Sequence, residues 1–143
     1  MTISAAEAAM FERFRTQVQN THDYPTKYGN GKYVNADESA ISGRLPALND
    51  GAFFRVTTNS AESAARELGP SPKVLHSGQL VVAVNAPTGT GDATLRTLCE
   101  AVKAAFSHEK VGSVEYLTPT IGDRIEASGW AQRTVRCPYR VFE

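Results

Sequence analysis

The chain has 143 residues and a mass of 15.4 kDa, a length typical of one domain with its own core. Apolar residues make up 41% and charged residues 21%, which excludes a disordered, collagen-like or coiled-coil chain. The 15 basic residues balance the 15 acidic ones, so bulk charge gives no reason to expect nucleic-acid or membrane binding. No stretch reaches the roughly 20 apolar residues of a membrane span, and the N-terminus lacks a secretion signal. We therefore expect no membrane partner and a protein that stays where it is translated.

The first residues have the pattern of an amphipathic helix. Ser4 and Glu7 have the spacing of a capping box. An apolar stripe at three- and four-residue steps follows, formed by Met10, Phe11, Phe14 and Val18. We predict a helix over residues 4–20, and then a loop-rich segment over residues 21–50 with one short strand.

The middle of the chain alternates strand patterns with turns. The sequence predicts weak pairing at residues 40–45, a turn at residues 49–51 and a strand at residues 52–58. Residues 59–72 are polar, hold a helical turn's worth of alanine and glutamate, and close with two prolines, which predicts an arm outside the core. Residues 74–85 are apolar on both faces at their centre, so we expect them to form the central strand of a sheet.

The second half predicts one more helix and two more strands. Residues 92–107 have an apolar helical stripe, and Asp92 is predicted as its N-cap. Strands are predicted at residues 111–118 and 129–142, and Pro138, which cannot donate to a ladder, places the end of the last strand at a sheet edge. The expected core comprises Leu80, Val82, Val84, Leu95, Leu98, Val102 and Phe106.

The last strand separates its residues onto two faces. Ala131, Val135, Cys137, Tyr139 and Val141 share the face that should pack, and Gln132, Thr134, Arg136 and Arg140 share the face toward water or a neighbour. These elements together predict a single α+β domain over residues 1–143. Its sheet is mixed and mostly antiparallel, and the two main helices pack on one face.

The turn PTGTGD stands where a phosphate-binding loop would, after a strand and before a helix. It lacks the Lys-Ser/Thr pair of such loops, and the charge of Asp92 would repel a phosphate. We interpret it as a structural turn and expect no cofactor.

Other catalytic or ligand-binding signals are weak. The histidines have no metal-ligand spacing, the cysteines are interpreted as buried small apolar residues, and the acidic pairs as solvated faces. These residues are His22, His76, His108, Cys99, Cys137, Glu62 with Glu67, and Asp37 with Glu38. No metal site and no catalytic residue is predicted, although a triad scattered in sequence escapes this test.

Two aromatic features allow alternatives. Trp130, the only tryptophan, either packs at the end of the sheet or anchors an interface. Tyr24, Tyr28 and Tyr33, interleaved with Lys27 and Lys32, resemble a platform for single-stranded nucleic acid. Zero net charge favours rings that pack onto the sheet or onto a neighbouring subunit.

The order of motifs resembles the tail terminator proteins of long-tailed bacteriophages. The resemblance runs through GAFFRVTT, then LGPSPKVLHSGQLVVAVNAPTGTGDATLRTLCEAVKAAF, then GWAQRTVRCPYRV, so it covers residues 50–143 by motif and residues 1–20 by element type. Its marks are Leu68-Gly69, Lys73 before Gly78, the strand and turn from Leu80 to Gly91, Phe106, Gly129 to Gln132, and Pro138-Tyr139. Residues 74–77 stand where relatives often carry an arginine.

This resemblance implies a structural virion assembly protein rather than an enzyme. Such proteins form a hexameric ring on the tail tube, end its polymerisation and present a surface to the head-side connector. The expected partners are further copies of the chain, the tail tube protein and the neck or connector protein, without specific nucleic-acid binding, although DNA passes through such a ring. The expected location is the head-proximal end of the tail, and the host cytoplasm during assembly. Candidate contact residues are Glu67, Leu68, Gln132, Thr134 and Arg136.

Three alternatives remain. One is another neck or head-tail joining protein, because the same fold serves several such roles. The second is a small enzyme with a scattered site. The third is an adaptor that adds a peptide strand at the edge expected near Pro138.

Overall fold

Three long antiparallel strands form the centre of a curled sheet. They are β3 (Phe53–Ala65), β4 (Val74–Pro87) and β9 (Trp130–Phe142), and β4 lies between the other two. The computed structural model describes residues 3–22, 24–29, 33–34, 52–65, 74–88 and 92–142. The prediction that residues 74–85 form a central strand is confirmed.

Short strands extend the sheet on both sides. They are β1 (Thr26–Tyr28), β2 (Tyr33–Val34), β5 (Lys110–Val111), β6 (Val114–Tyr116), β7 (Thr120–Ile121) and β8 (Ile125–Ala127). Among the described strands the order is β2-β1-β3-β4-β9-β6-β5, and β7 and β8 also pair with β9. The pairing of β1 with β3 is parallel and the other described pairings are antiparallel. The predicted α+β class with a mixed, mostly antiparallel sheet is confirmed.

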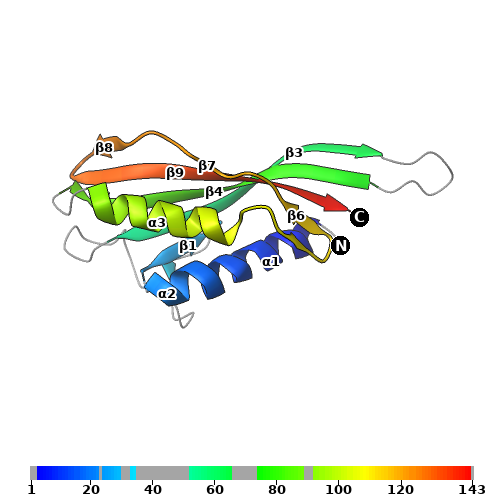
Figure 1. The fold of residues 1–143 in the computed structure, drawn as a ribbon, viewed down its shortest axis with the longest axis horizontal. Coiled ribbons are helices and arrows are strands. Elements are labelled where there is room, and N and C mark those ends of the chain that lie inside the picture. Colours follow the sequence, from blue (N-terminus) through cyan, green and yellow to red (C-terminus); the bar gives the residue numbers. More distant parts are fainter. Residues whose placement is uncertain are drawn as a thin grey trace.

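The helices cover one side of this sheet (Figure 1). The first helical segment is continuous through α1 (Ile3–Phe14), the π-helix η1 (Arg15–Gln19) and α2 (Asn20–His22), and the other helix is α3 (Asp92–Ala105). Both lie close to their predicted ranges. The first one begins at Ile3, so Ser4 lies within its first turn and is not the N-cap that the capping-box spacing predicts.

The core lies between the helices and the inner face of the sheet. Every described residue of the predicted core is at most 2% exposed: Leu80, Val82, Val84, Leu95, Leu98, Val102 and Phe106. The inner-face residues of β9 are buried as predicted, and Phe14 packs edge-on against Phe54 with ring centroids 5.2 Å apart. The apolar stripes of the helices and the inner-face residues of the strands therefore pack together in one core.

The π-helix places a polar side chain inside the fold. Gln19 is fully buried, and its Nε2 donates to the carbonyl oxygens of Tyr24 (3.2 Å) and Val34 (2.9 Å). The Tyr28 hydroxyl donates to Gln19 Oε1 at 2.8 Å. A buried amide is tolerated when its donors and acceptor are satisfied. Gln19 thus fastens the end of the first helical segment to the short strands β1 and β2.

Arg13 joins the two helices. Its Nε donates to the carbonyl oxygen of Ala105 at 2.7 Å, and its guanidinium pairs with Glu109. The same guanidinium lies 5.2 Å from the ring centroid of Tyr116. A cation beside the last carbonyls of a helix is favourable, so Arg13 stabilises the C-terminal end of α3 against α1 and β6.

The predicted arm has a different structure from the one expected. Asn59–Ala65 continue β3 and pair with β4, where the sequence indicated a helical turn. Cross-strand pairing with residues 74–79 overrides the weak local propensity of this polar, alanine-containing stretch. Figure 1 shows the far part of β3 and the start of β4 projecting at one end of the molecule. Residues 66–73, 35–51 and 89–91 lie outside the described residues, and with them the expected features at 40–45 and 49–51.

Pro138 does not lie at a sheet edge. Its strand, β9, has β4 on one side, and on the other side Leu117 donates its N–H to the Pro138 carbonyl oxygen at 3.0 Å. Because the N–H and C=O of one strand residue point the same way, the missing donor of Pro138 faces the link between β6 and β7, where the ladder is interrupted. The edge on which the peptide-adaptor alternative rests is therefore occupied.

Candidate interface

The outer face of the sheet, on the side away from the helices, holds the described part of the predicted contact surface. Gln132 and Thr134 are half-buried and Arg136 is exposed, all three on this face of β9. Their neighbours across β4 are Asn85, Ala83 and Val81 in the same order. The structure therefore brings these three candidates together, whereas Glu67 and Leu68 lie outside the described residues.

Small side chains form the middle of this outer face. Val81 and Ala83 are half-buried on β4, between Thr57 and Arg55 on β3 and Arg136 and Thr134 on β9. Arg55 and Thr57 are exposed. A small apolar strip with an exposed arginine on each side resembles a contact surface, which has an apolar centre and a polar rim.

A small cluster of aromatic rings lies at one end of the outer face. Phe53 packs edge-on against Trp130 with ring centroids 4.8 Å apart, and against Tyr33 at 5.7 Å. Arg55 Nε donates to the Tyr33 hydroxyl at 2.9 Å, which holds the guanidinium at the border of the cluster. Trp130 is half-buried, so it packs at the end of the sheet as predicted and also keeps part of its surface open.

Tyr24, Tyr28 and Tyr33 of the loop-rich segment pack against other aromatic rings. Tyr28 lies against Phe11 with ring centroids 5.5 Å apart, and Tyr24 lies against Phe54 at 6.3 Å. Tyr33 is 7% exposed. These ring contacts agree with the packing interpretation, although Tyr24 and Tyr28 keep part of their surface exposed. Lys32 lies outside the described residues.

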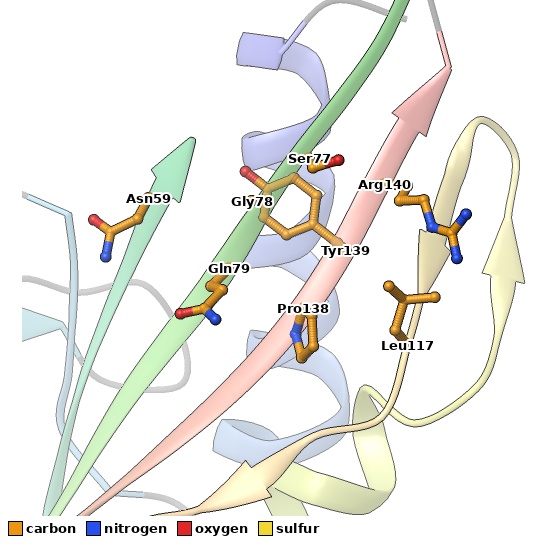
Figure 2. Close-up of a pocket in the computed structure, with 8 residues that line it drawn as sticks. All are labelled: Asn59, Ser77, Gly78, Gln79, Leu117, Pro138, Tyr139 and Arg140. Atoms are coloured by element: carbon orange, nitrogen blue, oxygen red, sulfur yellow. The ribbon is translucent and has the colours of Figure 1, made fainter. Parts of the chain in front are cut away.

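A shallow hollow of about 410 Å³ lies farther along the outer face (Figure 2). Asn59 from β3, Gln79 from β4, Pro138 and Arg140 from β9, and Leu117 surround it. Among the described residues that line it, Arg140 is the charged one, and no carboxylate, thiol or imidazole accompanies it. The hollow offers hydrogen bonds and one cation but no acid-base pair.

The floor of the hollow depends on Gly78. The Tyr139 ring crosses this glycine, as Figure 2 shows. A Cβ at position 78 would lie 2.4 Å from the Asn59 carbonyl oxygen and 2.6 Å from the Tyr139 hydroxyl oxygen. The register of β3 against β4 shifts at the same place, between Ser60 and Glu62. The glycine that the sequence shows as a motif residue is thus required by close packing.

A second, more apolar groove lies between the first helical segment and the short strands. It measures about 380 Å³, and Phe11, Tyr28 and Val34 line it with Glu12 and Arg15. Arg15 pairs with Glu12. No motif in the sequence indicates this groove, because it forms where helix and strands meet.

The described nucleophile and base candidates do not assemble into a site. Cys99 and Cys137 are both buried, and burial raises the pKa of Cys137 to about 12. Such a thiol is a poor nucleophile at neutral pH. His108 is exposed after α3, with its Nε2 3.0 Å from the Thr118 hydroxyl, while His76 lies on β4. The side chains of His22, Glu62 and Asp92, and all of Asp37, Glu38 and Glu67, lie outside the described part.

The described residues contain no cluster of three or more His, Cys, Asp or Glu suited to a metal ion. Within the same residues, the helices are too short or too polar to span a membrane.

Comparison with known proteins identifies the fold. No protein family model and no curated protein matches the chain. A solved structure whose title states no function is similar over 99% of this chain and 96% of its own, with a TM-score of 0.69 and 17% identity. At that identity the similarity shows a shared α+β architecture and nothing about activity.

Proposed function

We propose that this chain is a phage virion assembly protein that closes the tail tube as a hexameric ring. In this proposal it ends tube polymerisation and presents the joining surface for the head-side neck or connector protein. It acts at the head-proximal end of the tail and assembles in the host cytoplasm. The proposal originates in the motif order of the sequence.

The main observation that supports this proposal is that the two faces of the sheet differ, since the helices cover one and the other stays open. The helices cover one face of the sheet, while Arg55, Thr57 and Arg136 stay exposed on the other. The β3–β4 hairpin projects at one end. A ring needs two different surfaces on each subunit, because head-to-tail contacts close only when unlike faces meet. An outer sheet face and a projecting hairpin supply such unlike surfaces.

The chemistry of the described residues supports an assembly role over an enzymatic one. The hollow on the outer face lacks an acid-base pair, and the thiols are buried. The buried polar side chain of Gln19 has structural partners. The hydrogen bonds of Gln19 hold the first helical segment to the short strands β1 and β2.

Electron microscopy of purified protein mixed with tail tubes tests the proposal. The tubes are assembled from purified tail tube protein of a long-tailed phage. We expect a ring at one tip of each tube and arrested elongation. If tubes keep growing with bare tips while the protein binds purified connector, the neck-protein alternative takes its place. If the protein binds neither, an assembly role at the tail is wrong.

A further inference from the structure

Basic side chains form a diagonal stripe across the outer face of the sheet, although the whole chain is neutral. Register places Lys27 beside Arg55, and Arg136 lies two strands farther across and two residues along. Arg140 follows on the same strand as Arg136, and Lys110 lies two strands beyond Arg140 on β5. With about 4.8 Å between strands and about 3.3 Å per residue, the stripe is about 30 Å long.

The acidic residues of this face lie near one end of the stripe. Glu115 is in register with Arg140, and Glu62 is in register with the β4 neighbour of Arg140. On the described strands, the residues in register with Arg55 and Arg136 are neutral or basic. Both of these arginines are exposed. The middle of the outer face is therefore positively charged.

The hollow on the outer face lies where the stripe passes from Arg136 to Arg140 along β9. Besides Arg140, its polar side chains are those of Asn59, Ser77 and Gln79, which Figure 2 shows around it. Amides, hydroxyls and arginines are the side-chain groups that bind phosphate oxygens in protein–DNA contacts. The hollow thus adds neutral hydrogen-bond donors to the cations of the stripe.

The length of the stripe selects an extended anion. Successive cations are about 5–13 Å apart by strand spacing and rise, so a compact anion would contact one or two of them. A nucleic-acid backbone repeats its charge along its whole length, with one phosphate per about 3.4 Å of each DNA strand. Such a polyanion contacts the whole stripe at once. The charge of the face and the shape of the stripe therefore both complement a phosphodiester backbone.

The aromatic residues of the face favour a duplex over a single strand. Proteins hold single strands by stacking the bases on exposed rings. On the described outer face, Phe53 and Tyr33 are buried, and Trp130 is half-buried against Phe53. Contacts to phosphate alone suit a duplex, whose bases are already stacked on one another.

We infer that the outer face of the sheet binds the phosphate backbone of duplex DNA through Lys27, Arg55, Arg136 and Arg140. The inference goes beyond the proposed function and does not depend on it. Phosphate contacts carry no base information, so this binding is independent of sequence. Because the chain is neutral overall, the local stripe supplies the attraction, and salt weakens it strongly.

Fluorescence anisotropy of a labelled duplex of about 20 base pairs, titrated with the full chain, tests the inference. Two duplexes of unrelated sequence and one single strand of equal length are compared between about 50 and 200 mM salt. Arg136→Gln removes one cation of the stripe, and Arg136→Lys keeps the charge. Lys103→Gln on α3 is the matched control, because it removes the same charge on the helix side. Circular dichroism first shows that each variant is folded.

We expect both duplexes to bind equally and more tightly than the single strand. With three to four phosphates contacted, affinity should fall about 50-fold over this salt range, a logarithmic slope of about −3. Arg136→Gln should weaken binding about threefold to tenfold at about 50 mM salt and make the slope shallower by about 1. Arg136→Lys should restore binding to within about twofold, and Lys103→Gln should leave affinity and slope unchanged.

Four results would overturn the inference. They are no duplex binding at about 50 mM salt, an Arg136→Gln variant that binds like the wild type, an equal loss from Lys103→Gln, and tighter binding of the single strand. Polyglutamate, titrated as an unlabelled competitor, probes the other class of polyanion. If it displaces the duplex at equal charge concentration, the face belongs to an acidic protein surface rather than to DNA.

Discussion

The aromatic ring of Tyr139 lies against the backbone of Gly78, its direct partner across β4 and β9. Tyr139 is 2% exposed and belongs to the core, so the missing side chain at position 78 provides the space that the ring occupies. An aromatic side chain that covers a strand glycine compensates for the packing that the glycine lacks. The pair lies at the point where the β3–β4 hairpin begins to extend past the core.

Gly78→Ala should destabilise the protein by about 1–3 kcal/mol, because the new Cβ would overlap the Asn59 carbonyl and the Tyr139 ring. Gly122→Ala is the control, since its Cβ would meet the Thr134 carbonyl oxygen at 3.3 Å and needs only a small adjustment. Urea unfolding measures both. Equal midpoints for the two variants would show that the ring moves aside without cost.

Gln19→Leu should lower the free energy of unfolding by about 1–3 kcal/mol, because it removes the amide that bonds to Tyr24, Val34 and Tyr28. Gln17→Leu, on the exposed side of the same π-helix, should change it by no more than about 0.5 kcal/mol. Thermal unfolding followed by circular dichroism compares the two. A Gln19→Leu variant as stable as the wild type would mean that water replaces the network.

Leu98→Ala should cost about 2–5 kcal/mol, because this side chain is 2% exposed between α3 and the sheet. Thr97→Ala, one residue earlier on the exposed side of α3, is the control. Denaturant unfolding gives both values. A loss well below about 1 kcal/mol for Leu98→Ala would place the helix in another rotation about its axis.

Cys137 should make stability fall at alkaline pH. Burial raises its pKa in the folded protein from 9.0 to about 12. Below pH 9 the thiol keeps its proton in both states and contributes no pH dependence. Between pH 9 and 12 the unfolded chain releases the proton first, so stability falls by at most about 1.4 kcal/mol per pH unit.

Urea unfolding between pH 8 and 11 measures this slope for the wild type and Cys137→Ala. Other groups titrate there too, and burial also raises the pKa of Tyr116, so the difference between the two slopes isolates the thiol. We expect a shallower decline for Cys137→Ala. Parallel slopes would show that the thiol reaches water in the folded state.

Periodicity predicted the parts of the fold that bury a regular stripe. The apolar run around Val82 indicated the central strand, and the spacing of Leu95, Leu98 and Val102 indicated α3. The alternation along β9 separated its buried and open faces, and so found Gln132, Thr134 and Arg136 as outer-face residues. In these segments local pattern and tertiary packing agree.

Features created by pairing could not be predicted in the same way. Residues 59–65 have weak strand propensity, and their conformation depends on β4 beside them. The direction of Pro138's missing donor depends on which neighbour lies on which side of β9. That Arg55 and Arg136 lie on one face, on either side of Val81 and Ala83, appears only when register aligns residues from separate strands across the sheet.

The length of tail tubes in particles that lack this chain's gene tests the central claim most directly. If the protein is the terminator, electron micrographs should show tubes of widely varying length without heads, and the wild-type gene should restore one uniform length. Tubes of normal, uniform length that merely fail to join heads would contradict termination and assign the protein to the neck.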